Sequence, residues 1–179
     1  MTAAPEFRLN SEGIVLLVRI LLGFTSAMLV QARVSQSLLI FWAGVVLVLC
    51  VWIDAITGWY FRRRGPKSPS TTELEIYADA SCFVAAPIEL AFVLARSSWP
   101  IVCLPVFLVA AVYRLARFQV QGLIGKGYLG LPVTYNGYLF PLAGLAAHFL
   151  PNGTDAILVV LLIATSALMV SNRIVVPEY

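Results

Sequence analysis

The chain has 179 residues, of which 60% are hydrophobic and 12% are charged, with a mean hydropathy of +0.90 and a formal net charge of +3. This composition excludes an ordinary soluble globular domain. We expect membrane lipid around the chain and no nucleic acid among its partners.

Six apolar segments approach the length of about 20 residues that a helix needs to cross a bilayer. They are Gly13–Val30, Leu38–Ile56, Leu74–Ala95, Ile101–Ala116, Tyr135–Leu150 and Ala156–Val170. Backbone groups in lipid need hydrogen-bond partners within the protein, which favours helices for runs of this length. We therefore predict an all-α membrane protein, a six-transmembrane-helix bundle that forms one domain over residues 1–179. Residues 1–12 are expected to be a juxtamembrane segment.

Most lysines and arginines outside the predicted spans, or at their ends, fall on one side of the membrane. One side carries Arg8, Arg62, Arg63, Arg64, Lys67, Arg114, Arg117, Lys126 and Arg173, and the other carries Arg33 and Arg96. By the positive-inside rule, both termini and the loops after the second and fourth spans are cytoplasmic. The expected location is the bacterial inner membrane, as a multi-pass protein with its active site on the cytoplasmic side.

Acidic residues are concentrated where the second predicted span ends and the third begins, and four of the nine in the chain lie there: Asp54, Glu73, Glu75 and Asp79. Glu75 and Asp79 are four residues apart and so share one face of a helix. Asp54 ends the preceding span, and a short hairpin returns the chain, so three carboxylates can converge at the mouth of the bundle. An all-oxygen site of this kind suits Mg²⁺ or Mn²⁺.

The cations that follow Asp54, from Arg62 to Lys67, suit a ligand that carries phosphate. The alternative is that the acids are solvated helix ends, and that the cations are a topology anchor or a patch for anionic lipid headgroups. Composition and spacing leave both interpretations open.

The same stretch resembles the signature of the CDP-alcohol phosphatidyltransferase family, written D-x2-D-G-x2-A-R-x8-G-x3-D-x3-D. The corresponding positions here are Asp54, Thr57, Gly58, Phe61, Arg62, Thr71, Glu75 and Asp79. The spacing is kept throughout, and four identities differ: Thr57, Phe61, Thr71 and Glu75. The segments TTELEIYADASCFVAAP, YRLARFQV, GYLGLPVTYNGYLFP and LMVSNRIV look like segments of the phosphatidylserine synthase branch.

The resemblance implies a metal-assisted transfer of a phosphatidyl group from CDP-diacylglycerol to a small alcohol, with serine as the leading acceptor and release of CMP. In the family, carboxylates hold two divalent metals, which here implies Asp54, Glu75 and Asp79 as ligands, with Thr57 as a weaker neutral one. Asp79 is also implied as the catalytic base. The resemblance further implies a homodimer.

Other positions of the signature border the cytidine in the family, so Gly58, Phe61, Arg62 and Thr71 are implied as nucleotide-binding residues. Phe61 and Thr71 replace residues that leave space, so the pocket is expected to be narrower or reshaped.

Two arginines and an asparagine are implied at the lipid phosphate or the acceptor: Arg114, Arg117 and Asn136. Arg114 and Arg117 are three residues apart and face nearly the same way. The alternative for the arginines is a snorkelling anchor without a ligand, and for Asn136 a hydrogen bond between helices.

A second hypothesis of a different class is a non-catalytic or repurposed relative that binds lipid or nucleotide without turnover. A channel or transporter is disfavoured because the spans show no broken inverted repeat and the acidic cluster lies at one face.

Overall fold

The computed structural model describes residues 10–32, 36–63, 69–122 and 127–177 of the chain. In chain order the elements are α1 (Ser11–Gln31), α2 (Gln36–Arg62), α3 (Pro69–Ala80), the π-helix η1 (Ser81–Ala85), α4 (Ala86–Leu94), α5 (Ser98–Gln121), β1 (Gly127–Leu129), the 3-10 helix η2 (Val133–Tyr135), α6 (Asn136–Phe149), the 3-10 helix η3 (Pro151–Gly153), α7 (Thr154–Val170) and β2 (Val175–Pro177).

Five helical stretches of the described residues are long and apolar enough to cross a membrane: 11–31, 38–61, 70–94, 98–121 and 151–170. The third combines α3, η1 and α4 into one span. The predicted fifth span corresponds to α6, which has 14 residues. The all-α membrane class is therefore supported, and the count of six spans stays a prediction.

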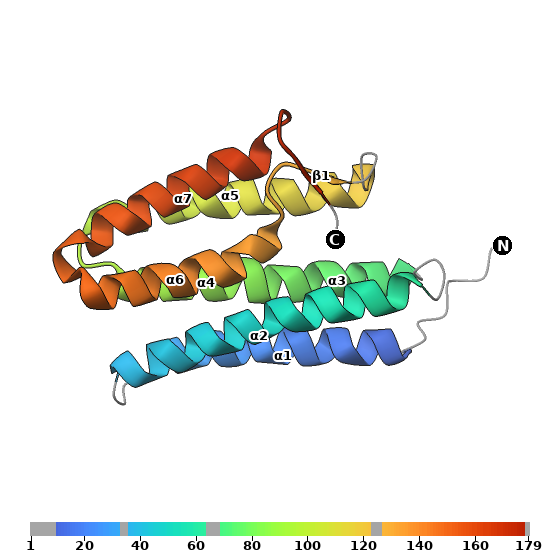
Figure 1. Cartoon of the computed structure of the whole chain (residues 1–179), viewed down its shortest axis with the longest axis horizontal. Helices are drawn as coiled ribbons and strands as arrows, with labels where there is room; N and C mark the ends of the chain where they lie inside the picture. Colours follow the sequence, from blue (N-terminus) through green and yellow to red (C-terminus); the bar gives the residue numbers. More distant parts are fainter. Residues whose placement is uncertain (1–9, 33–35, 64–68, 123–126, 178–179) are drawn as a thin grey trace.

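The helices form an elongated bundle in which α5 lies along α7, and α1 packs against α2, α3 and α4 (Figure 1). Helix α6 packs against both α2 and α4. Helix α1 begins at the end of the bundle where α2 ends and α3 begins (Figure 1). This arrangement brings the acidic residues of α2 and α3 next to the first turns of α1.

The third span changes from α to π geometry at η1, just before a proline. In an α-helix the carbonyl oxygen of Phe83 would accept the N–H of residue 87, but Pro87 has none. The side-chain amide of Asn136 on α6 donates to this oxygen at 3.0 Å instead. Asn136 is fully buried, and this hydrogen bond joins α6 to the third span. A hydrogen bond between helices is the alternative role that we gave for Asn136 from the sequence.

The strands β1 and β2 pair antiparallel, with Tyr128 opposite Val176, and β1 lies beyond the end of α7 and beside the last turns of α5 (Figure 1). We did not predict it from the sequence. Helix α5 also continues to Gln121, past the expected end at Ala116. Gly130 follows β1 with a φ of +76°, and a Cβ there would lie 2.6 Å from the Met169 oxygen. Glycine is therefore required at this turn.

Candidate functional site

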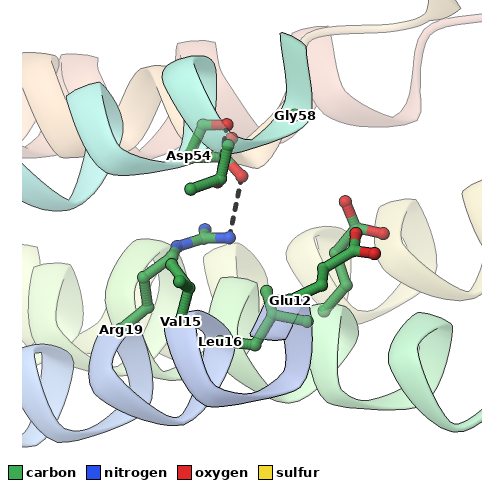
Figure 2. Close-up of a pocket in the computed structure, with 8 residues that line it drawn as sticks. Glu12, Val15, Leu16, Arg19, Asp54 and Gly58 are labelled. Carbon is green, nitrogen blue, oxygen red and sulfur yellow. Dashed lines mark hydrogen bonds and ion pairs between the residues drawn. The ribbon is translucent and has the colours of Figure 1, made fainter. Parts of the chain in front are cut away.

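Arg19 on α1 lies between the two aspartates that the sequence singles out. Its Nη1 is 2.8 Å from Oδ1 of Asp54 on α2, and its Nη2 is 2.7 Å from Oδ1 of Asp79 on α3. Figure 2 shows the side chains of Arg19 and Asp54 pointing toward one another. We refer to Arg19, Asp54 and Asp79 as the ion triad. It joins three helices through charge-assisted hydrogen bonds, which are stronger than neutral ones.

The guanidinium is held in place by a close approach of α1 to η1. A Cβ at Gly23 would lie 2.9 Å from the carbonyl carbon of Ser81, so only glycine allows this packing. Cys82 donates its thiol to the backbone oxygen of Arg19 at 3.0 Å. The ring of Phe83 lies 5.4 Å from the guanidinium carbon. As a result the Arg19 side chain is 1% exposed, whereas those of Asp54 and Asp79 are 24% and 16% exposed.

A pocket opens beside the ion triad, and its lining includes Glu12, Arg19, Asp54, Thr57, Gly58 and Glu75. Figure 2 shows Glu12 and Gly58 at one end of this pocket, beyond Arg19 and Asp54. The structure thus brings Glu75 and Asp54 to one pocket, as the sequence predicts. It also adds Glu12 from α1, which the sequence reasoning did not single out.

Thr57 stands at the second aspartate position of the signature, and its side chain forms a hydrogen bond within its own helix, α2. Its hydroxyl donates to the backbone oxygen of Ile53 at 2.6 Å. Serine and threonine often bond in this way to the carbonyl one turn earlier. The hydroxyl oxygen keeps its lone pairs but carries no charge, so Thr57 would hold a cation more weakly than the aspartate of the signature. The role of Thr57 as a metal ligand stays a prediction.

The residues that the structure describes do not fit a two-metal centre. Within the described ranges, no group of three histidine, cysteine, aspartate or glutamate side chains lies together in a way that could hold a metal ion. Two of the three predicted carboxylate ligands, Asp54 and Asp79, are bound to Arg19. The requirement for Mg²⁺ or Mn²⁺ therefore stays a prediction, and we assign no step of the chemistry to a metal.

The predicted nucleotide-binding positions are divided between the pocket and its surroundings. Gly58 lines the pocket. The ring of Phe61 packs edge-on against Tyr60, with ring centres 5.1 Å apart. Thr71 is buried, and its hydroxyl lies 3.4 Å from the side-chain nitrogen of Asn10, the residue that caps α1. Arg62 ends α2, and its side chain lies outside the described residues.

The two predicted anion-binding arginines of α5 differ in what their guanidinium groups contact. Arg117 donates to the backbone oxygens of Leu129 at 2.6 Å and Met169 at 2.8 Å, and to Oδ1 of Asn172 at 2.8 Å. Two further oxygens, those of residues 170 and 171, lie at 3.4 Å. Arg117 therefore caps the carbonyl end of α7 and ties it to β1.

Arg114 is 4% exposed, and its Nε has no hydrogen-bond partner. Its guanidinium carbon lies 5.4 Å from the ring of Phe118 and 5.8 Å from that of Tyr128. A buried, incompletely paired guanidinium is suited to bind an anion, because such a ligand would supply the missing acceptors. Of the two arginines, Arg114 is thus the better candidate.

Comparison with known proteins gives one distant similarity. The chain is 29% identical over 118 residues to the CDP-diacylglycerol--serine O-phosphatidyltransferase of Methanocaldococcus jannaschii. The match covers 65% of this chain and 58% of that relative, so the chain spans less than two thirds of the relative's length. No family model matches the chain. This similarity supports a relation to the CDP-alcohol phosphatidyltransferases and suggests a role in phospholipid synthesis.

Proposed function

We propose that the chain is a membrane-embedded transferase of phospholipid synthesis. It moves a phosphatidyl group from CDP-diacylglycerol to a small alcohol, serine being the first candidate, and releases CMP. The observation that carries this proposal is the meeting of Asp54 and Asp79, from two different helices, beside a pocket at one end of an apolar bundle. The similarity to a serine phosphatidyltransferase over 118 residues supports the same activity.

In the transfer, the hydroxyl oxygen of the acceptor attacks the phosphorus that carries diacylglycerol. A new P–O bond forms to the acceptor, the P–O bond to CMP breaks, and CMP leaves with the bonding electrons. The hydroxyl proton passes to Asp79, which acts as general base. Arg19 fixes the orientation of Asp79 from one side through Oδ1, while the carboxylate keeps part of its surface exposed. Arg114 binds a phosphate of the donor or an anionic group of the acceptor.

The membrane arrangement that fits this activity places the pocket at the cytoplasmic side of the membrane, where the headgroup of a CDP-linked lipid is expected. Helix α1 begins and α2 ends at the pocket side of the bundle (Figure 1). We propose that both termini are cytoplasmic, in a bacterial inner membrane, as the distribution of basic residues predicts. A homodimer stays a prediction that follows from the family resemblance.

The test is CMP release by the purified chain in detergent with CDP-diacylglycerol. Serine, glycerol phosphate, inositol and inositol phosphate are supplied separately, each with Mg²⁺, with Mn²⁺ and with a chelator. We expect CMP to form only when an acceptor is present, and fastest with serine. CMP release that is equal with and without every acceptor would indicate hydrolysis and contradict the transfer.

A specific observation favours the second hypothesis, a relative that binds without turnover. Two of the carboxylates of the site, Asp54 and Asp79, are paired with Arg19, and a neutral threonine, Thr57, stands at the second aspartate position of the signature. For such a protein, CDP-diacylglycerol would raise the thermal unfolding temperature while no acceptor yields CMP. A protein that is unaffected by the donor in both assays would contradict both functions.

A further inference from the structure

We propose that, in the protein without bound nucleotide, the guanidinium of Arg19 takes the place of a divalent cation between Asp54 and Asp79. The inference rests on the proposed function only in that both concern the same site. It assigns Arg19 as the positioning residue of the two carboxylates, a role that in a metal-dependent transferase would belong to the ion.

The first argument is geometric. One terminal nitrogen of Arg19 contacts Asp54 at 2.8 Å and the other contacts Asp79 at 2.7 Å, so the guanidinium fills the space that separates the two carboxylates. A bound Mg²⁺ needs oxygen ligands at about 2.1 Å in near-octahedral geometry. An ion shared by Asp54 and Asp79 would require Arg19 to move out.

The second argument is that Arg19 has no favourable place to go. Its side chain is 1% exposed, it comes from the segment of α1 packed against η1, and its Nε has no hydrogen-bond partner. The two aspartates are therefore the principal partners of a buried charge. Giving them up to a metal would leave the guanidinium uncompensated in an apolar bundle, which is strongly unfavourable.

The third argument is electrostatic. Within the ion triad, two carboxylates and one guanidinium have a net charge of minus one. Without the guanidinium, the same two carboxylates would have a net charge of minus two and would attract a divalent cation more strongly. Placing Mg²⁺ or Mn²⁺ beside Arg19 would also bring like charges together in a site largely shielded from water. Thr57 offers no compensating charge, because its side chain is a neutral hydroxyl where the signature has a carboxylate.

The experiment is a titration of the purified full chain with Mn²⁺ alone, without CDP-lipid or acceptor, with free Mn²⁺ measured by electron paramagnetic resonance. For the wild type we expect no stoichiometric binding up to roughly 1 mM Mn²⁺. For Arg19→Gln we expect about one ion per chain, bound at least ~10-fold more tightly than by the wild type. Arg63→Gln removes the same charge from an exposed side chain near the end of α2 and should behave as the wild type.

Two outcomes would overturn the proposal. One is binding of Mn²⁺ by the wild type as tight as by Arg19→Gln. The other is no gain of binding in a folded Arg19→Gln. If that variant does not fold, the wild type alone still decides: submillimolar Mn²⁺ binding that Asp54→Asn abolishes would contradict the proposal, and its absence would support it. Because no substrate is present, either result leaves the test of phosphatidyl transfer intact.

Discussion

Replacing Asp79 with asparagine should lower acceptor-dependent CMP release by about 100- to 10,000-fold, the range in which a general base contributes to catalysis. The asparagine side chain keeps an oxygen for Nη2 of Arg19 but accepts no proton from the acceptor. The measurement is the initial rate of CMP release with the best acceptor, together with thermal unfolding of the same samples.

The matched control is Glu73→Gln, which removes one negative charge from an exposed position of the same helix. It should keep wild-type activity. Asp79→Asn also weakens the pairing of Arg19, so we expect a lower unfolding temperature, but Asp54 still compensates the guanidinium and the chain should fold. A folded Asp79→Asn variant with activity within about threefold of the wild type would contradict the assignment of the base.

Replacing Arg117 with leucine should destabilise the chain more than the same change at Arg114, three residues earlier on α5. Arg117→Leu leaves several backbone oxygens at the end of α7 without their donor, and each such loss costs about 1–3 kcal/mol when the group is buried. We expect a loss of at least ~3 kcal/mol in total. Thermal unfolding of both variants in one detergent measures the difference.

Arg114→Leu is the informative partner of this pair. It removes a buried guanidinium whose Nε has no partner, so its effect on folding should be small. Its effect on binding should be large, because the guanidinium that binds the anionic donor is lost. CDP-diacylglycerol should therefore protect the variant from heat less than it protects the wild type. Equal destabilisation by the two changes, with donor protection retained in Arg114→Leu, would contradict the separate roles of the two arginines.

The spans could be predicted from the sequence because hydropathy over about 20 residues depends only on local composition. The predicted segment Gly13–Val30 corresponds to α1, and Ala156–Val170 to α7. The sheet of β1 and β2 was not predicted, since its three-residue strands carry almost no pattern and pair across more than 40 positions. The π-helix η1 depends on Pro87 together with Asn136, two residues that local periodicity does not connect.

The candidate site was only partly predictable. The spacing of Glu75 and Asp79 on one helix, with Asp54 at the end of the preceding span, predicted that these carboxylates lie near one another, and Asp54 and Glu75 line one pocket. Arg19 was missed because it is a single cation within a long apolar run, although a charge inside a span is itself a signal of function. Its partners lie 35 and 60 positions away, so only the packing of α1 against α2 and α3 reveals them.

The most direct test of phosphatidyl transfer is to reconstitute the full chain in vesicles that contain CDP-diacylglycerol, add isotope-labelled serine, and analyse the lipids by mass spectrometry. We predict labelled phosphatidylserine in an amount equal to the CMP released, and none with Asp79→Asn. No labelled lipid from serine or from any other acceptor, formed by protein that CDP-diacylglycerol still protects from heat, would contradict transfer and identify a relative that binds the donor without turnover.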